Sequence, residues 1–357
     1  MKIHRAWLVA LIIGLPSVTG PATAAPPELP SVNLKVSGGA RTLTQFRYIQ
    51  EPFFTKELTE ASGGAVTTTF GSLEDLGIQG PEVLRLLSLG MFDISEGTLS
   101  YMAGEAAQFE ALDLPGLTEN IDEQRRMAEG FRAELEKIMA ERFNVKLLSL
   151  SARALQVLYC NKPVTGLGDL AGLKVRTTNR STAELIEALG AQSINLPFAE
   201  VVPALDRSVV DCAVTGTEAG NTARWWEVSD HLVILPLGWS MTFFGANAAN
   251  WARLPAETQA FLAERLTGFE DRHWKQASLD VQDGINCNIG SASCKAGVKA
   301  DRPMTLVELS ADDKALAKRL LTEKVLSSWA ERCGGQCVSV WNANVGSVVN
   351  VQAGEPK

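Results

Sequence analysis

The stretch "DLAGLKVRTTNRSTAELIEALGA" (residues 169–191) predicts a β-strand followed directly by a helix. Apolar and charged side chains alternate in its "LKVR" segment, which is typical of a short strand with one buried face. Ser181 and Glu184 have the S-x-x-E spacing of a capping box, so a helix is expected to open at Ser181 and to end at Gly190. This order places Arg176 where the strand gives way to the helix, the edge at which ligands of open α/β sheets usually bind.

Strands and helices alternate along the rest of the chain, and this order predicts an α/β protein. At 357 residues the chain is too long for one ordinary core, so two lobes are expected. No low-complexity linker separates them, which indicates that the chain crosses between the lobes more than once. Besides the opening stretch, strands are expected at 32–40, 65–70, 91–95 and 144–152, a strand–helix–strand unit at 193–216, and helices at 51–64, 120–142, 254–285 and 313–333.

The N-terminus has the pattern of a secretory signal peptide, assigned to residues 1–25. Lys2 and Arg5 precede an apolar run, and small residues at 22–24 offer a cleavage site. The run is too short to span a bilayer comfortably, and an uncleaved anchor is the alternative interpretation. We therefore expect a soluble, exported protein located in the periplasm.

The chain is acidic. Its net charge is −8, and removal of the signal peptide takes away two basic residues, leaving 31 basic against 41 acidic residues, or −10. An acidic chain without a basic cluster argues against nucleic acid or anionic lipid as a partner. It leaves room for one local cationic pocket that binds a small anion.

Six cysteines in an exported chain favour disulfides. Neighbours in sequence suggest Cys287–Cys294 and Cys333–Cys337, which leaves Cys160 with Cys212; this is one of fifteen possible connectivities. A zinc site at "CGGQC" is the competing explanation, but no histidine lies near it.

Enzymatic interpretations have little support in the sequence. His231 and His273 are the histidines that follow the signal peptide; His231 is expected to be structural, and His273, in the charged segment "EDRHWK", to be solvated. The motifs of nucleophile elbows, zinc proteases, phosphate loops and dinucleotide folds are absent. Arg176 is a better candidate for chemistry, because a guanidinium beside a helix start can hold a carboxylate with two parallel hydrogen bonds. The alternative is a surface arginine paired with a nearby acid.

Several stretches together resemble the periplasmic solute receptors of TRAP (tripartite ATP-independent periplasmic) transporters. They are "GLKVR", "LGAQSINLPFAEVVPALDRSVVDCAVTG", "TEASGGAVTTTFGSLEDLGIQGPEVLRLLSLGMFDIS" and "NWARLPAETQAFL". The resemblance covers residues 32 to about 285 and leaves out the C-terminal part with four cysteines.

The resemblance implies a two-lobed periplasmic-binding-protein-like α/β fold with mixed sheets and a long lobe-spanning helix. Lobe I would comprise residues 26–152 plus 242–281, and lobe II residues 153–241 plus 282–357. Such a receptor closes around a carboxylate-bearing solute and delivers it to TRAP membrane permease subunits, without catalysis or ATP hydrolysis. A monomer is expected, with no cofactor beyond a possible ligand-associated cation.

The resemblance also implies roles for individual residues. Arg176 would bind the ligand carboxylate and Phe198 would pack on the ligand. A polar residue shortly after "VVD" would face the cleft; Thr215 is the first choice, then Glu218 and Asn221.

Members of the family that take sialic acid have a second arginine upstream, and Gln156 stands at that position here. This argues against a sialic-acid-type ligand and favours a small 2-oxo or 2-hydroxy acid. Arg153 is a further cationic candidate. Glu96, Thr98 and Tyr101 follow a predicted strand and would supply polar groups from the other lobe.

Trp239 is the preferred candidate among the clustered aromatics for stacking on an aromatic acid. The sequence thus predicts a receptor for a monocarboxylate, a 2-oxo or 2-hydroxy acid, or an aromatic acid. Two alternatives remain open: a ligand sensor for a membrane receptor kinase, and an exported α/β enzyme acting on carboxylates.

Overall fold

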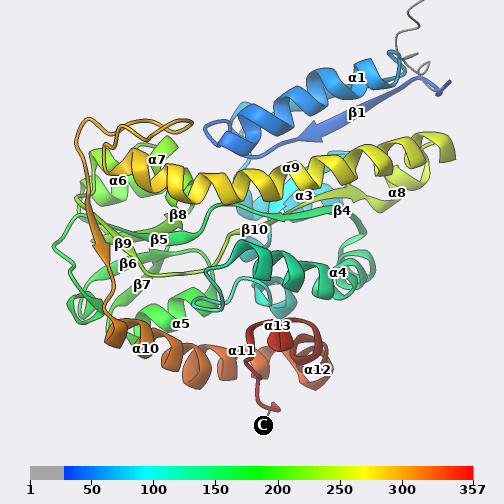
Figure 1. The fold of residues 1–357 in the computed structure, drawn as a ribbon. Coiled ribbons are helices and arrows are strands. Elements are labelled where there is room, and N and C mark those ends of the chain that lie inside the picture. The colour runs from blue at the N-terminus through cyan, green and yellow to red at the C-terminus, as the bar shows by residue number, and fades with distance from the viewer. Residues whose placement is uncertain (1–27, 357) are drawn as a thin grey trace, which may run out of the picture.

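Two mixed β-sheets lie next to each other, with helices packed around both (Figure 1). The computed structural model describes residues 28–356, so the predicted signal peptide lies outside the described residues. No described helix is long and apolar enough to cross a membrane.

Sheet I is five-stranded, in the order β2-β1-β3-β10-β4. Its strands are β1 (Val32–Ser37), β2 (Val66–Gly71), β3 (Ile94–Thr98), β4 (Val145–Ala152) and β10 (Met241–Asn247). β1 runs parallel to β2 and β3, whereas β10 runs antiparallel to β3 and β4. The carboxyl end of β3 therefore meets the amino end of β10, which brings their side chains to one edge.

Sheet II is six-stranded, in the order β11-β9-β5-β8-β6-β7. Its strands are β5 (Gln156–Cys160), β6 (Lys174–Thr177), β7 (Gln192–Asn195), β8 (Cys212–Gly216), β9 (His231–Ile234) and β11 (Thr305–Glu308). The central strands β5 and β8 are buried along their whole length, which explains their nearly continuous apolar sequences "QVLYC" and "CAVTG". β6, β7 and β8 are parallel, so their carboxyl ends share one edge.

The chain joins the two sheets three times within the described residues. It passes from β4 to β5 through residues 153–155 and from β9 to β10 through residues 235–240. The third connection is the 33-residue helix α9 (Ala256–Asn288), which is about 50 Å long and runs across the molecule from α8 to α7 (Figure 1). The expectation of several crossings is confirmed, and the exact division into lobes stays a prediction.

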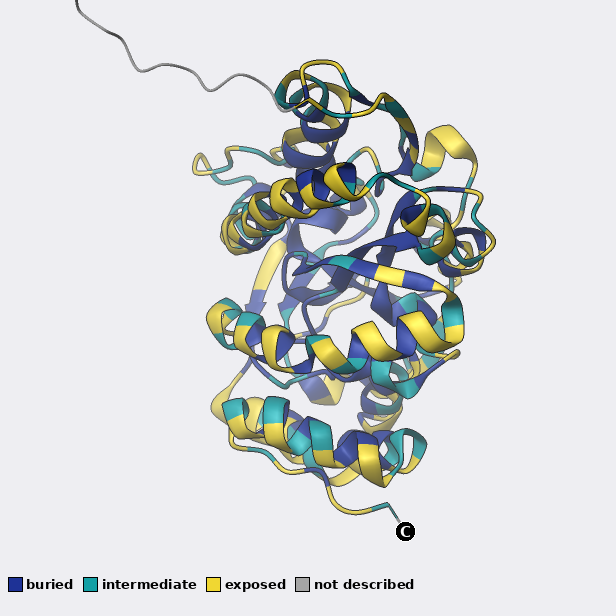
Figure 2. Cartoon of the chain, turned by 90° about the vertical axis from the view of Figure 1, so that its right-hand side faces the viewer, coloured by how far each residue is buried: buried dark blue, intermediate teal, exposed yellow. Residues whose placement is uncertain are grey.

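The remaining helices cover the outer faces, where Figure 2 shows exposed residues outside and buried residues inside. They are α1 (Leu58–Ala61), α2 (Leu73–Leu76), α3 (Val83–Ser88), α4 (Ile121–Phe143), α5 (Arg180–Ala188), α6 (Val201–Asp206), α7 (Thr217–Thr222), α8 (Ala248–Ala252), α10 (Ala311–Leu320), α11 (Leu326–Cys333), α12 (Gly335–Trp341) and α13 (Ser347–Val349). α9 lies so close to α7 that a Cβ on Gly284 would come within 2.5 Å of the Thr217 carbonyl carbon. Glycine at this position permits the contact.

The C-terminal helices form a base under the molecule (Figure 1). Trp329 and Trp341 are fully buried with ring centroids 5.4 Å apart, and their indole N–H groups donate to the carbonyls of Ala107 and Ala111. Arg332 of α11 forms ion pairs with Glu110 and with Glu184 of α5. The base therefore contacts elements associated with both sheets.

The N-cap of the helix after β6 lies two residues earlier than the sequence predicts. The Asn179 carboxamide oxygen accepts the N–H of Thr182 at 2.8 Å, so Asn179 is the N-cap and the capping box at Ser181 was wrong. Glu184 instead accepts hydrogen bonds from Arg180 and Arg332. The helix ends at Ala188 with Leu189 as its C-cap, and Gly190 follows with a φ of +85°, which suits the glycine expected after the helix end.

Other differences concern strands. The strand expected at 91–95 lies at 94–98, and β5 and β10 are not predicted by the sequence pattern. Both are buried throughout and lack the alternation that marks a half-exposed strand.

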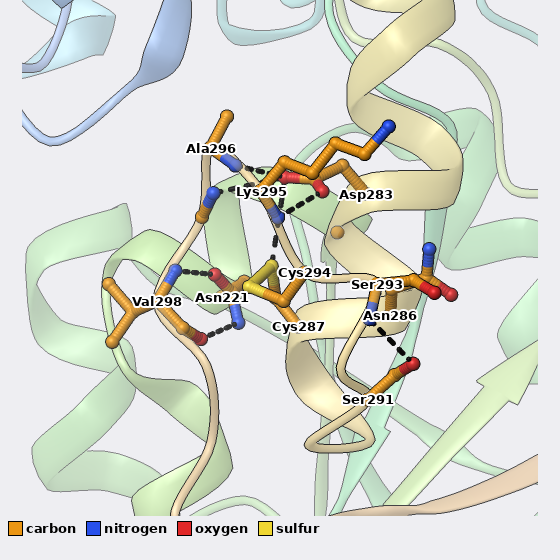
Figure 3. The surroundings of a disulfide bond; sticks show 12 residues. Asn221, Asp283, Asn286, Cys287, Ser291, Ser293, Cys294, Lys295, Ala296 and Val298 are labelled. Carbon is orange, nitrogen blue, oxygen red and sulfur yellow. Dashed lines mark hydrogen bonds between the residues drawn. A yellow bond between two sulfur atoms is a disulfide. The ribbon is translucent and has the colours of Figure 1, made fainter.

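The three predicted disulfides, Cys160–Cys212, Cys287–Cys294 and Cys333–Cys337, are confirmed. Residues 28–356 contain no group of three or more His, Cys, Asp or Glu side chains that could hold a metal ion, so the zinc alternative has no support there. Figure 3 shows how the loop after α9 is fixed: the Asp283 carboxylate accepts the backbone N–H groups of residues 295–297, and Asn221 pairs with the backbone of Val298.

Candidate functional site

A cavity of about 150 Å³ lies between the facing edges of the two sheets. Sheet II contributes residues at the carboxyl ends of β6 and β8 and the amino end of β5. Sheet I contributes the carboxyl end of β3 and the turn that follows it. Of the residues predicted for the site, the cavity is lined by Arg176, Phe198, Thr215, Gln156, Arg153, Glu96, Thr98 and Tyr101.

Arg176 is the most constrained charged group in the cavity wall. Its side chain is fully buried, although arginine is almost never buried without a partner. Nε donates to the carbonyl of Leu196 at 2.9 Å, and Nη1 donates to the carbonyl of Val214 at 2.7 Å. Both carbonyls belong to the parallel strands beside β6 or to the chain just after them, so the sheet itself fixes the guanidinium.

The charge of Arg176 has no counter-ion among the described residues. No carboxylate lies within ion-pair distance, and the second terminal nitrogen, Nη2, has no hydrogen-bond partner. Burial lowers the pKa of Arg176, and the Tyr101 hydroxyl acts in the opposite direction. A buried cation in a cavity wall that has an unpartnered donor is strongly stabilised by an incoming anion.

Arg153 is held differently, from the side of sheet I. Its Nη2 donates to the Glu96 carboxylate at 2.9 Å, and Nη1 donates to the Thr98 hydroxyl at 3.1 Å. Glu96 and Thr98 stand two residues apart on β3, so they project from the same face of the strand. Arg153 therefore reaches the cavity with its charge already paired.

Aromatic and apolar side chains close the other walls. Phe198 stacks on Trp225 with a centroid distance of 5.3 Å, and Trp225 is buried behind it against Tyr159. Leu43 and Ala219 belong to a small apolar cluster that reaches Phe198 and joins the two sides of the cavity. The cavity thus combines a cationic end with an apolar body.

Gln156 and Thr215 sit next to each other on paired strands. Gln156 opposes Gly216 and Val157 opposes Thr215 in the antiparallel β5–β8 pair. The Gln156 carboxamide donates weakly to the carbonyl of Leu237, at 3.4 Å. Both side chains are buried, and both can offer polar contacts to a ligand near Arg176.

Three predicted site residues do not line the cavity. Trp239 packs in the core, and its indole N–H donates to the carbonyl of Thr118. Asn221 ties α7 to the backbone of Val298. Glu218 points to the contact between α7 and the segment at Thr44, whose N–H it accepts at 2.8 Å.

The expectation that His273 is solvated was wrong. Its ring is fully buried, with Nδ1 2.9 Å from the carbonyl of Phe269 and Nε2 3.3 Å from Gln50. Burial lowers the pKa of His273 to about 4, so the ring is neutral at pH 7. It lies outside the cavity and has a structural position.

The sequence interpretation missed part of the cavity wall. Thr178 could have been found, because it follows Arg176 by two residues at the end of β6. The apolar wall had no local signal, since it combines Leu43 with residues between the start of α2 and the start of α3: Leu73, Ile78, Pro81 and Val83.

The contact at Thr44 buries two carboxylic acids. Glu218 accepts the Thr44 N–H, and Asp280 of α9 accepts the Thr44 hydroxyl at 2.5 Å. Burial raises the pKa of both acids, and each is further affected by neighbouring charges. The folded protein therefore keeps protons on this pair at pH values where the unfolded chain has lost them.

This arrangement predicts that the free energy of unfolding falls as pH rises above about 5, because the unfolded state then binds fewer protons than the native state. Glu218→Gln should flatten that fall, since it removes one raised pKa. The check is the melting temperature between about pH 5 and 8. Glu264→Gln, on an exposed position of α9, is the control and should follow the wild type. Parallel curves for Glu218→Gln and the wild type would contradict the assignment.

The chain is similar in sequence to bacterial solute-binding proteins. A family model described as "Bacterial extracellular solute-binding protein, family 7" matches residues 42–332. The C4-dicarboxylate-binding periplasmic protein DctP of Rhodobacter capsulatus is 25% identical over 264 residues, which cover 73% of this chain and 76% of that protein.

Solved structures show the same fold. DctP7 of Bordetella pertussis, an extracytoplasmic solute receptor binding pyroglutamic acid, is similar with a TM-score of 0.78 and 21% identity, over 88% of this chain and 99% of that chain. DctPAm of Advenella mimigardefordensis strain DPN7T, a sugar acid binding protein in complex with galactonate, has a TM-score of 0.79 and 16% identity, over 90% and 100% of the two chains.

These matches confirm the predicted resemblance to TRAP solute receptors and the α/β fold with mixed sheets and a long helix. The family is one of binding proteins, not of enzymes. The predicted periplasmic location agrees with the location in the name of the Rhodobacter relative. The chain belongs to the DctP family, the bacterial extracellular solute-binding proteins of family 7.

Proposed function

We propose that this protein is a TRAP receptor that binds a small monocarboxylate, with the carboxylate on Arg176 and the body of the ligand against Phe198. The observation that carries the proposal is the fully buried Arg176 guanidinium, which belongs to the cavity lining and whose Nη2 has no hydrogen-bond partner. A carboxylate at this position would neutralise the charge and accept the free N–H group.

Further contacts support the same ligand class. Gln156, Thr215 and Thr178 surround the cationic end and can hydrogen-bond to a 2-oxo or 2-hydroxy group next to the carboxylate. Ligands named for the relatives, a C4-dicarboxylate, pyroglutamic acid and galactonate, are all carboxylates. The receptor would hand its ligand to TRAP permease subunits in the membrane.

Thermal unfolding with a panel of organic acids tests the proposal. The panel contains 2-oxo acids, 2-hydroxy acids, aromatic monocarboxylates and, as a neutral control, the amide of each acid. A ligand that binds the native state at a hundred times its Kd stabilises it by about 2.7 kcal/mol, which raises the melting temperature. We expect at least one monocarboxylate to stabilise the protein and its amide to have no effect. Equal stabilisation by acid and amide would contradict a carboxylate-binding role.

A further inference from the structure

Few buried charged side chains line the cavity, and their net charge limits the charge of a ligand that can bind there. Arg176 and Arg153 are the cations of the lining, and Glu96 is its buried anion. Glu74 also borders the cavity, but its side chain is exposed and accepts the Arg41 N–H, so solvent screens its charge. The buried lining therefore carries two positive charges and one negative charge.

The Glu96 carboxylate forms an ion pair with Arg153. The two side chains are 1% and 16% exposed, with a distance of 2.9 Å between Arg153 Nη2 and Glu96 Oε1. The other carboxylate oxygen, Oε2, lies against Gly39, at the place where any larger residue would put its Cβ. Glu96 therefore cannot swing away towards Gly39, and the ion pair is held between Thr98 of β3 and the Gly39 backbone.

An ion pair of this kind is neutral as a unit. With Arg153 neutralised, Arg176 is the one uncompensated cation of the lining. The first carboxylate of a ligand would pair with Arg176. A second carboxylate would meet the Glu96–Arg153 pair or the apolar wall at Leu43, and would be buried without a counter-ion, which is strongly unfavourable.

We propose that Glu96 is a specificity-determining residue: by neutralising Arg153 it restricts the cavity to ligands with a single negative charge. This inference rests on the proposed carboxylate-binding function and deepens it. It predicts a ligand with one carboxylate, whereas the Rhodobacter relative is named for C4-dicarboxylates.

Matched pairs of acids provide the test, because they differ by a carboxylate in place of a methyl group. Butyrate with succinate, and 4-methylbenzoate with terephthalate, are titrated calorimetrically into the full-length mature protein at pH 7. The wild type is expected to prefer the monocarboxylate of at least one pair by tenfold or more. Glu96→Gln frees the charge of Arg153 at nearly constant shape, and should shift the preference at least tenfold towards the dicarboxylate.

Two variants control the result. Glu264→Gln removes an exposed carboxylate of α9 that does not line the cavity, and should leave the preference within about twofold because solvent screens that charge. The double variant with Glu96→Gln and Arg153→Gln removes both charges and should restore the preference for the monocarboxylate.

A second measurement needs only the wild type. Any succinate that binds should do so as its monoanion, with uptake of about one proton when titrations in buffers of different ionisation enthalpy are compared. Dicarboxylate binding without proton uptake, or an unchanged preference in Glu96→Gln, overturns the role of Glu96 and leaves the proposed function intact. A wild type that binds no carboxylate of either kind overturns the proposed function itself.

Discussion

Arg176→Ala is expected to weaken binding of the stabilising carboxylate about a hundredfold, which corresponds to about 3 kcal/mol. The variant removes the buried charge and the unpartnered Nη2 donor from the cavity lining. Its effect on folding should be small, because the two hydrogen bonds lost to Leu196 and Val214 are offset by removal of an uncompensated buried charge. Isothermal titration calorimetry measures the affinity, and circular dichroism checks the fold.

Two further variants sharpen this test. Arg176→Lys keeps the charge but loses the planar fork that contacts both carbonyls, so binding should still fall tenfold or more. Arg180→Ala removes a neighbouring arginine that is exposed and paired with Glu184, and should leave the affinity unchanged. An Arg176→Ala protein that binds as tightly as the Arg180→Ala protein would remove Arg176 from the site.

The second large effect concerns the disulfide Cys160–Cys212. It joins directly opposed residues of β5 and β8 in the middle of sheet II, and its cysteines are 52 residues apart in sequence. Closing a loop of that length restricts the unfolded chain strongly, so replacing both cysteines with alanine should lower the free energy of unfolding by about 4 kcal/mol.

The disulfide Cys333–Cys337 in the C-terminal base supplies a matched comparison. Its cysteines are four residues apart, and the same reasoning predicts a loss of about 2 kcal/mol for their replacement with alanine. Urea denaturation of both variants measures the difference. Equal losses would show that loop length does not set the contribution of these disulfides.

Local patterns were sufficient to predict the strand and helix around Arg176. The alternation in "LKVR" and the glycine at the helix end are determined by neighbouring residues, so tertiary context does not override them. The helix start was displaced because Asn179 is as good a cap as Ser181 and stands in an extended conformation beside the helix. Local rules alone do not choose between two such caps.

His273 shows a different limit. The charged neighbours in "EDRHWK" indicate solvent, but Phe269, His273 and Ala277 follow one another at intervals of four and share the buried face of α9. The charged residues Glu270, Asp271 and Arg272 occupy the other faces, where each forms an ion pair. The helical periodicity therefore predicts that His273 is buried, whereas the charged composition of the segment wrongly predicts that it is solvated.

The Glu96–Arg153 pair could not be foreseen from sequence, because its members are 57 residues apart and meet through strand pairing in sheet I and the first crossing between the sheets. Trp239 was predicted from sequence but does not line the cavity. It belongs to a cluster of aromatic residues in the sequence, but in the fold its indole N–H donates to the carbonyl of Thr118. Side-chain direction follows from the packing of distant segments.

The triple connection between the sheets limits how the molecule can move. Two sheets joined by a single segment can rotate relative to each other about several axes. Three connections, one of them the helix α9, restrict torsion and leave bending as the motion of lowest energy. Motion of one sheet relative to the other should therefore be a hinge-like bending, with little torsion. Such a motion would open the cavity between the two sheets along a single direction.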